Sequence, residues 1–503
     1  MHFISYDLGT GGVKASLFTQ GMETLAKVFI PYPTYYPAPG WHEQRPGDWW
    51  NAVCESSHKL LEKAGITAAD VGCVALSGHS LVTVPVDAEK NVLLEQVPIW
   101  SDSRATKQTE QFFQSVNEEA WYMKTGNGFP PACYSIFKLM WLKETQPELF
   151  SRIDKVLGSK DYINFRFTGE IYTDHSYASG LGAYDLKKGC LDTELLSAAG
   201  LSREIFPPIV PSHHIIGNVT EQAAAQCGLV PGTPVACGGV DNACMALGAV
   251  GAEQGRVYVS LGSSSWIPIN SDRPVLDAKR RPYVFAHIQE GMYTSAYSIF
   301  AGGSSLQWIR DQLCSELTDD NAYAIMDQWA DEVPLGANGV FFNPSLAGGT
   351  RQDKSVNIKG AFVGMHLGTT RADMIRAGLE GISLNLKLSL EALREQVEVS
   401  DRFLFCGGGS KSKIWMQMFA DVFNAQVIKT NIDQDAAALG AAAICAKATG
   451  YWSDYSKIPA LHQVQHTFCP NVNRAQAYQR LLKQFVHISD VLADLGDYMS
   501  STQ

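Results

Sequence analysis

The sequence predicts a mixed α/β protein that is built from two similar units. Short apolar runs that end in glycine-rich turns, at 71–77, 235–239 and 402–409, alternate with amphipathic stretches such as 373–393. A chain of 503 residues has room for two or three domains with sizeable cores. An internal repeat is the third observation, and it favours duplication of one α/β unit.

The internal repeat consists of two short motifs that recur in the same order. Asp7-Leu8-Gly9-Thr10 returns as Ser260-Leu261-Gly262-Ser263, and each copy lies between two predicted strands. Ala246-Leu247-Gly248-Ala249 returns as Ala438-Leu439-Gly440-Ala441, inside stretches of small residues that read as helices. Either match is short enough to arise by chance, but their shared order favours duplication.

The boundary between the two units is expected near residue 250. The stretch 248–255 is rich in glycine and alanine, which would permit two backbones to cross closely at a hinge. We therefore expect one domain over residues 1–248 and a second over residues 249–503.

Composition and charge exclude several classes of protein. Hydrophobic residues make up 46% of the chain and charged residues 18%, which excludes a disordered chain or a coiled coil. A net charge of −11 argues against nucleic acid as a partner, and no apolar run approaches the roughly 20 residues of a membrane helix. Eleven scattered cysteines and the lack of a signal-peptide pattern lead us to expect a cytoplasmic protein with reduced thiols.

The chain opens with a predicted strand, a glycine-rich turn at 9–12 and a second strand at 13–18. This is a β-hairpin, whereas a P-loop or a dinucleotide-binding fingerprint needs a helix directly after its glycines. Asp7, Thr10 and Lys14 surround the turn with an acid, a hydroxyl and an ammonium group. Such a loop can turn backbone N–H groups toward a polyphosphate, and its acid can hold a hydrated Mg²⁺. A hairpin whose glycines only satisfy the turn is an equal alternative.

Asp241 is the second acid with a chemical interpretation. It follows an apolar strand at 234–237 and two glycines, and it opens a helix of small residues. A general base needs an ionised carboxylate, and the helix N-terminus would keep Asp241 ionised at neutral pH. An ordinary helix-capping aspartate fits the same spacing, so the residues alone leave both interpretations open.

Six motifs, in the same order along the chain, resemble those of the FGGY carbohydrate kinases. They are DxGTxxxK at 7–14, GWxEQxPxxWW at 40–50, WxDxR at 100–104, Lys-Asp-Tyr at 160–162 followed by Thr-Gly-Glu at 168–170, GGxDN at 238–242 and GGGSKSxxWxQxxAD at 407–421. The resemblance covers about residues 1–450. It implies the actin-like ATPase fold, with two RNase-H-like domains and an active site in the cleft between them. This agrees with the repeat found in the sequence.

The resemblance also implies roles for single residues, with the sugar and the base in the first domain and the nucleotide in the second. Asp241 would be the general base, Asp7 would act through Mg²⁺, and Asn242 would bind the sugar or orient the base. The residues implied for ATP are Gly9, Thr10, Lys14, Gly262, Ser263, Gly303, Gln307, Gly407, Gly408 and Ser412. The residues implied for the acceptor are His79, Ser80, Asp102 and Arg104, together with Asp241 and Asn242.

Several of these residues also fit a purely structural interpretation. Ser412 fits a helix cap, as does its neighbour Ser410. Asp102 and Arg104 fit a surface ion pair with each other equally well, and a single histidine such as His79 is commonly satisfied in place. The 45–50 segment fits a plain helix start with proline in the first turn, which we favour over a role in sugar binding.

The acceptor is the least determined part of the predicted function. The xylulose-kinase branch of the family usually shows Gln-Met-His-Gly, and the glycerol-kinase branch Gln-Arg-Glu, where this chain reads Gly78-His79-Ser80-Leu81. We predict an ATP- and Mg²⁺-dependent kinase most like the xylulose-kinase branch, acting on a ketopentose such as xylulose. Ribulose, a ketohexose, glycerol and erythritol are alternative acceptors. A homodimer is left open.

An actin-like or Hsp70-like ATPase without a sugar substrate is the alternative from another class of protein. Such a protein needs a peptide-binding or polymerising module. The segment that follows residue 450 is too short for one. We therefore favour the kinase.

Overall fold

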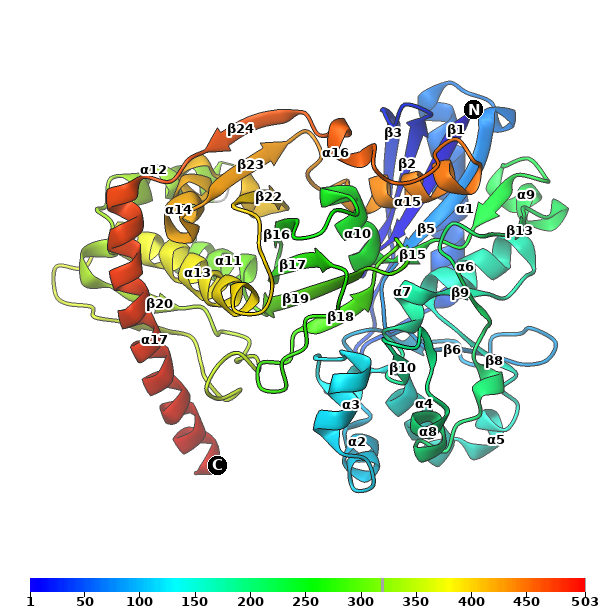
Figure 1. Ribbon diagram of the computed structural model, residues 1–503, viewed down its shortest axis with the longest axis horizontal. Coiled ribbons are helices and arrows are strands. Elements are labelled where there is room, and N and C mark those ends of the chain that lie inside the picture. The colour runs from blue at the N-terminus through cyan, green and yellow to red at the C-terminus, as the bar shows by residue number, and fades with distance from the viewer. Residues whose placement is uncertain (318–320, 503) are drawn as a thin grey trace.

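The computed structural model describes residues 1–317 and 321–502, and it contains two sheet-based units side by side (Figure 1). The first unit is built on a sheet with the strand order β13-β14-β5-β1-β2-β3. Its strands are β1 (His2–Leu8), β2 (Gly12–Thr19), β3 (Thr24–Pro31), β5 (Val71–Gly78), β13 (Ile215–Asn218) and β14 (Pro234–Ala236), and β15 (Gly239–Val240) pairs with β5. The hairpin predicted at the N-terminus is confirmed, because β1 pairs antiparallel with β2.

The second unit is built on a sheet with the strand order β24-β23-β22-β16-β17-β19-β18. Its strands are β16 (Val257–Leu261), β17 (Ser265–Ser271), β18 (Tyr283–Ala286), β19 (Tyr293–Ile299), β22 (Arg402–Cys406), β23 (Gln426–Thr430) and β24 (Val464–Phe468). In both sheets the repeated strand, β1 or β16, pairs antiparallel with its hairpin partner and parallel with β5 or β22. The two sheets thus share one topology, and the predicted duplication of an α/β unit is confirmed.

Two helices connect the units at the centre of the molecule (Figure 1). They are α10 (Asp241–Val250) and α15 (Ala436–Ala448), which carry the two copies of the Ala-Leu-Gly-Ala motif. A Cβ atom on Gly248 would lie 1.8 Å from the Ala436 carbonyl oxygen, and one on Gly440 would lie 2.0 Å from the Cys244 carbonyl oxygen. The repeated glycines therefore allow the two backbones to touch, so the close crossing occurs within these helices.

The remaining helices cover the sheets and build a lobe below the first sheet in Figure 1. The helices used below are α1 (Pro46–Ala64), α3 (Glu118–Thr125), α6 (Ser159–Thr168), α7 (His175–Ala178), α11 (Gly303–Leu313), α13 (Arg371–Arg394), α14 (Lys413–Phe423) and α17 (Val472–Ser501). The amphipathic stretch predicted at 373–393 forms α13, whose apolar face lies in the core of the second unit. No helix within the described residues is long and apolar enough to cross a membrane.

Helix α1 shows that the tryptophans of the 40–50 motif have a structural role. Pro46 occupies the first turn of the helix, as predicted. Trp49 is fully buried and donates its indole N–H to Gln44 Oε1 over 3.0 Å. The structural interpretation of this segment is therefore confirmed.

Candidate active site

The two candidate acids meet at one edge of the first sheet. Asp7 lies near the end of β1 and is in register with Ser77 on β5, which is in register with Gly239 on β15. Asp241 follows β15 directly as the first residue of α10. Because β1, β5 and β15 are parallel neighbours, their carboxyl ends bring the two aspartates together, which is where α/β sheets commonly place a ligand.

The pKa of Asp241 lies far above the usual value of an aspartate. Burial first, and then the nearby charge of Asp7, raise its pKa to about 7, while a hydrogen bond from the Asn242 backbone N–H acts in the opposite direction. The expectation that the helix N-terminus keeps this carboxylate fully ionised is thus wrong, because burial and a like charge outweigh the helix dipole. A pKa near the working pH suits a general base.

Asp7 is the other half of this acidic pair. It accepts a hydrogen bond of 2.7 Å from the Ser77 hydroxyl. Burial raises its pKa, while Ser77 and the Lys14 ammonium group oppose that rise. Two facing carboxylates suit a hydrated Mg²⁺, which takes one or two carboxylates plus phosphate oxygens. The donor set on this edge therefore fits the metal that the sequence led us to expect.

A cavity of about 420 Å³ opens beside the two acids. Its polar lining residues are Thr10, Ser80, Asp241, Asn242, Ser264 and Ser298, and its other walls are mainly aromatic, from Trp100, Phe129, Tyr134, Trp266, Tyr283, Phe285 and Phe300. We call this space the acceptor cavity. Aromatic faces with a few polar groups are a suitable surface for a sugar, whose C–H faces are apolar and whose hydroxyls need partners.

Trp100 and Tyr134 are residues of this cavity that the sequence analysis did not assign to the site. The Trp100 indole N–H donates to Thr10 Oγ1 over 2.9 Å, so it fixes the hydroxyl of the hairpin turn. The Tyr134 hydroxyl accepts a hydrogen bond of 3.0 Å from the Phe129 backbone N–H. Trp100 belongs to the WxDxR motif, so the sequence carried a signal for it, whereas only the charged residues of that motif were assigned to the site.

Asp102 and Arg104 form a buried ion pair away from the acceptor cavity. Arg104 binds Asp102 and Glu43 at 2.7 and 2.6 Å, and its guanidinium group lies 3.9 Å from the centre of the Trp41 ring. Asp102 is fully buried and also accepts a hydrogen bond from the His42 backbone N–H. An Asp–Arg pair, the structural alternative, describes these contacts, although the pair is buried where a surface pair was expected.

His79 is not among the described residues that line the acceptor cavity, whereas its neighbour Ser80 is. The His79 ring is 1% exposed, its Nδ1 donates to the Leu8 carbonyl oxygen over 3.0 Å, and it packs edge-on against Trp49. Burial lowers its pKa to about 4, so the ring is neutral. Its Nε2 has no partner within the described residues.

The loops implied for ATP lie mostly in the second unit. The Gly303 N–H at the start of α11 donates to the Gly262 carbonyl oxygen over 2.9 Å, and the Ser304 N–H donates to the Ser263 carbonyl oxygen over 3.0 Å. A Cβ on Gly303 would lie 2.3 Å from that Gly262 oxygen, so only glycine fits. The loop is thus held against a helix start while the Ser263 side chain stays exposed.

A second glycine turn follows β22. Gly407 has a φ of +95°, and its N–H donates to Asp433 Oδ1 over 2.7 Å. Gly408 is exposed, as is Gln307 on α11. Ser412 accepts the Trp415 backbone N–H over 3.1 Å and caps α14, which is the structural alternative given for it.

The first-unit residues implied for ATP are divided between two places. Gly9 belongs to the hairpin turn, where its N–H donates to the Gly12 carbonyl oxygen, and Thr10 lines the acceptor cavity. Lys14 reaches across to the second unit, where its ammonium group donates to the Gln434 carbonyl oxygen over 2.8 Å.

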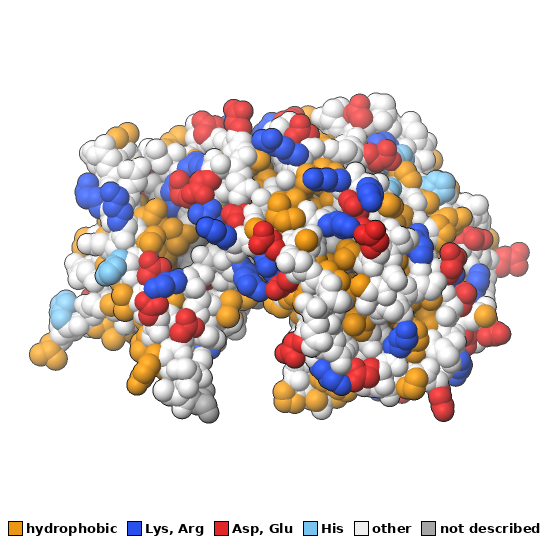
Figure 2. Space-filling view, turned by 60° about the horizontal axis from the view of Figure 1, so that its bottom comes forward, with side chains coloured by type: hydrophobic (Ala, Val, Ile, Leu, Met, Phe, Trp, Pro, Cys, Tyr) orange, Lys and Arg blue, Asp and Glu red, His pale blue; other side chains and the backbone are white. Residues whose placement is uncertain are grey.

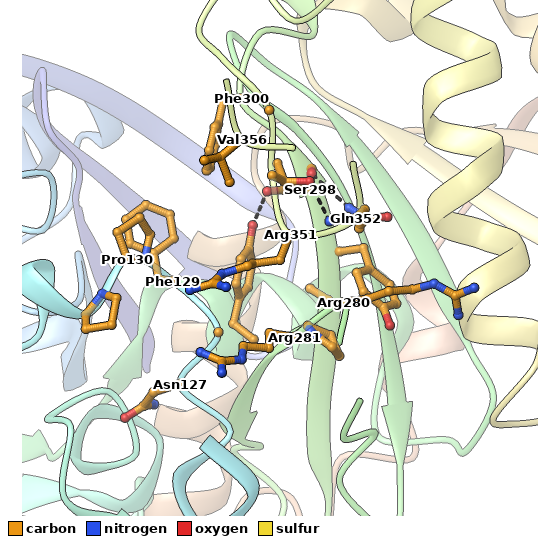
Figure 3. A pocket seen from close by; sticks show the side chains of 18 residues that line it. Asn127, Phe129, Pro130, Arg280, Arg281, Ser298, Phe300, Arg351, Gln352 and Val356 are labelled. Atoms are coloured by element: carbon orange, nitrogen blue, oxygen red, sulfur yellow. Dashed lines mark hydrogen bonds between the residues drawn. The ribbon is translucent and has the colours of Figure 1, made fainter. Parts of the chain in front are cut away.

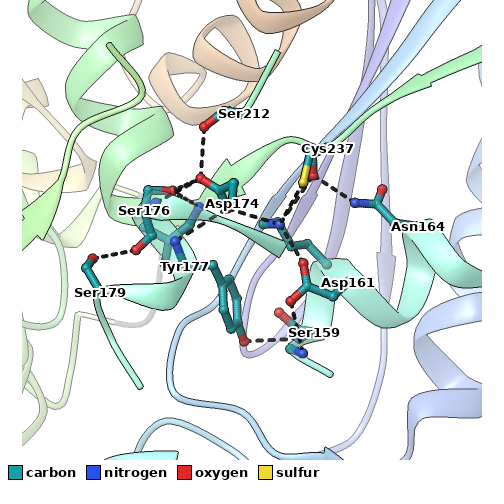
Figure 4. A network of polar contacts seen from close by, with 12 residues as sticks. Ser159, Asp161, Asn164, Asp174, Ser176, Tyr177, Ser179, Ser212 and Cys237 are labelled. Carbon is teal, nitrogen blue, oxygen red and sulfur yellow. Dashed lines mark hydrogen bonds and ion pairs between the residues drawn. The ribbon is translucent and has the colours of Figure 1, made fainter. Parts of the chain in front are cut away.

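A buried polar network joins Asp161, Asp174 and Ser176 (Figure 4). Lys160 on α6 is fully buried and binds Asp161 at 2.6 Å and Asp174 at 3.0 Å. Asp174 accepts the hydroxyl of Ser176, and the Ser176 hydroxyl oxygen in turn accepts the Val240 N–H over 2.9 Å. Because Val240 precedes Asp241, this chain of contacts fixes the backbone on which the candidate base stands.

Comparisons with known proteins agree with this fold. The model of the N-terminal domain of the FGGY family of carbohydrate kinases matches residues 2–248, and that of the C-terminal domain matches residues 257–449. A protein named xylulose kinase from Bacillus subtilis (strain 168) is 29% identical over 501 residues, covering 99% of both chains. A protein named gluconokinase from Bacillus licheniformis is 27% identical over 498 residues, 98% of this chain and 96% of that one.

A solved structure extends the agreement to three dimensions. The crystal structure of xylulose kinase from Rhodospirillum rubrum superimposes with a TM-score of 0.90 at 29% identity, covering 99% of this chain and 100% of that chain. Two duplicated α/β units with this fold are the architecture of the actin-like sugar kinases. The chain belongs to the FGGY family of carbohydrate kinases, which phosphorylate a small sugar and use ATP with Mg²⁺.

Proposed function

We propose that this kinase phosphorylates a ketopentose, xylulose first and ribulose next, with Asp241 as the general base. The observation that carries the proposal is an aspartate of pKa about 7 in the wall of an aromatic, sugar-sized cavity. Relatives that bear the name xylulose kinase, at 29% identity, support the choice of acceptor.

In this proposal the first unit holds the sugar and the second holds the nucleotide. Asp241 takes the proton of the acceptor hydroxyl as its oxygen attacks the terminal phosphorus of ATP and ADP leaves. Asn242, Ser80 and Thr10 offer hydrogen bonds to the other hydroxyls from the cavity wall. Bound Mg²⁺ would neutralise phosphate charge, and Asp7 is the residue that would hold it.

The ATP contacts remain predictions for the two glycine loops of the second unit. Their backbone N–H groups and small side chains leave room for phosphates, as expected of such loops. Gly262, Ser263, Gly303 and Gln307 form one group, and Gly407 and Gly408 form the other. Lys14 and Ser412 would need to give up their present contacts with Gln434 and Trp415 to bind ATP through their side chains.

A panel of acceptors at equal concentration tests the proposal. ADP release is measured with ketopentoses, ketohexoses, gluconate, erythritol and glycerol, and with no sugar. We expect xylulose to be fastest and glycerol at least about tenfold slower, because a site built for several hydroxyls discriminates against an acceptor that lacks them. If ADP release were faster with glycerol or erythritol than with every ketose, the ketopentose assignment would be wrong and the kinase assignment would still hold.

Two properties of the protein remain predictions beside this one. A cytoplasmic location is expected from the sequence, and fractionation of the source cells tests it. A homodimer is the other, and sedimentation of the purified chain over a range of concentrations tests it.

A further inference from the structure

A second cavity adjoins the acceptor cavity, and the proposed reaction does not use it (Figure 3). It has a volume of about 430 Å³ and shares Phe129, Tyr283, Ser298 and Phe300 with the acceptor cavity. Three segments build most of the rest of its wall, namely 127–131 from the first unit, and 280–283 and 349–352 from the second, and Ala296, Tyr297 and Val356 complete it. A ligand in this space would therefore lie within reach of a sugar in the acceptor cavity.

The charged side chains that line this second cavity, among the described residues, are all positive. Arg280, Arg281 and Arg351 are the charged side chains among its described lining residues. In Figure 3, Arg281 and Arg351 extend toward Phe129 and Pro130, whereas Arg280 extends the other way. Two guanidinium groups beside aromatic walls suit an anion, because arginine offers paired donors to a carboxylate or a phosphate.

The acids that pair with these arginines stand outside the lining. Arg281 and Arg351 share one carboxylate, that of Glu118 on α3, and the Arg351 contact is loose at 3.4 Å with half of the side chain exposed. Arg280 instead binds Glu395 at 2.5 Å. Two cations that share one anion leave a net positive charge, and a second anion would relieve it.

Two neutral lining residues each have a polar atom without a hydrogen-bond partner among the described residues. Asn127 is 3% exposed, its Nδ2 donates to the Ser179 carbonyl oxygen, and its Oδ1 has no partner within the described residues. The hydroxyl of Tyr297 is likewise buried without a partner in that part of the chain. Buried polar atoms are usually paired, but neither of these two atoms is open to the cavity, so the case for an anion rests on the arginines.

We propose that this second cavity binds the carboxylate or phosphate group of a small sugar-derived anion, gripped by Arg281 and Arg351 in competition with Glu118. The anion has two possible sources. It is either the far end of an acidic acceptor that spans both cavities, or a separate ligand beside a neutral acceptor. The proposal does not require that the acceptor be a ketopentose, so it fails or holds independently of the proposed function.

Direct titration of the full chain tests the competition. The probes are gluconate, its uncharged counterpart sorbitol, and inorganic phosphate, each measured by calorimetry at low ionic strength. We expect Arg351→Gln to weaken gluconate or phosphate binding by about fivefold or more, and Glu118→Gln to tighten it by a similar factor. Arg280→Gln is the matched control in the same segment, and its affinity should stay within about twofold of wild type.

Arg351→Gln and Glu118→Gln are expected to change the anion affinity in opposite directions, so misfolding cannot explain both results. A misfolded Arg351→Gln would also lose turnover with the best acceptor of the panel, whereas Glu118→Gln must gain affinity to support the proposal. Anions that fail to bind better than sorbitol would overturn it. Equal affinities in Arg351→Gln, Arg280→Gln and Glu118→Gln would overturn it too.

The two sources of the anion are then separated by the kinase assay. If gluconate is phosphorylated, and Arg351→Gln raises its KM while leaving that for xylulose unchanged, the anion belongs to the acceptor. If gluconate or phosphate binds without being phosphorylated and shifts the KM for xylulose, it is a separate ligand. Either result supports the anion site.

Discussion

Each half of the molecule has an aspartate shortly before its Ala-Leu-Gly-Ala motif, and the two aspartates make different contacts. An ungapped alignment of the Ala-Leu-Gly-Ala motifs sets Asp241 opposite Asp433, each five residues before the first alanine. Asp433 accepts the Gly407 N–H and lies 3.4 Å from the Ser410 hydroxyl, so it braces a glycine turn. Asp241 accepts only the N–H of its own neighbour among the described residues, and it faces the acceptor cavity.

The difference shows what separates a structural carboxylate from a reactive one. The Gly407 N–H and the Ser410 hydroxyl donate hydrogen bonds to Asp433. Burial without such donors, together with the charge of Asp7, raises the pKa of Asp241 and leaves its oxygens free for substrate. The two aspartates that the motif alignment matches thus differ in their hydrogen-bond donors, and Asp241 is the one left available for chemistry.

The largest effect is expected when these two aspartates are replaced one at a time. Asp241→Asn should lower turnover by about 10²–10⁴-fold, because an amide cannot take the proton of the acceptor hydroxyl. Asp433→Asn, the matched control, should instead raise the KM for ATP by loosening the glycine turn, with a much smaller loss of turnover. Steady-state kinetics on both variants measures this. Similar losses of turnover in the two would show that Asp241 is not the base.

The second prediction concerns Asp7, the like charge beside the base. Asp7→Asn should raise the Mg²⁺ concentration needed for half-maximal activity and lower turnover by roughly tenfold or more, because the metal neutralises charge on the transferred phosphoryl group. A Mg²⁺ titration of the variant and wild type at saturating ATP measures both. An unchanged Mg²⁺ requirement would reduce Asp7 to a residue of the hairpin.

The third prediction follows from the pKa of about 7 at Asp241. Because the base must be deprotonated, kcat/KM should fall about tenfold for each pH unit below that pKa. The folded chain also keeps a proton that the unfolded chain releases above pH 4, so this residue should cost stability as the pH rises toward 7. Asp241→Asn should therefore melt at a higher temperature than wild type at pH 8, with a smaller difference at pH 6. A flat kcat/KM between pH 5.5 and 8 would contradict the assigned base.

The sequence predicted the hairpins, the duplication and the family because these depend on local patterns. Glycine turns between apolar runs and the motif order were sufficient for that. The acceptor cavity was harder, since its walls combine Trp100 and Phe129 with Trp266 and Phe300 from the other unit. Asp102 and Arg104 show the limit most clearly. Charged residues in a motif look functional, yet only the fold reveals Glu43 and Trp41 around Arg104.

The smallest effect is expected from substitutions in the network that holds Asp241 in place. Ser176 and Ser212 both donate to Asp174 Oδ2, but only the Ser176 hydroxyl oxygen also accepts the Val240 N–H beside the base. Ser176→Ala should therefore leave that N–H unpaired and lower turnover by several-fold to about tenfold, with the KM for ATP unchanged.

Ser212→Ala is the matched control, because it removes one hydrogen bond to the same carboxylate without touching Val240. Its turnover should stay close to wild type, although its melting temperature falls as much as that of Ser176→Ala. Ser176→Thr, which keeps the hydroxyl, should recover part of the loss. If the two alanine variants lost turnover in proportion to their stability, the network would be a structural support only. A loss confined to Ser176→Ala would instead place the control of the base in a single buried hydroxyl.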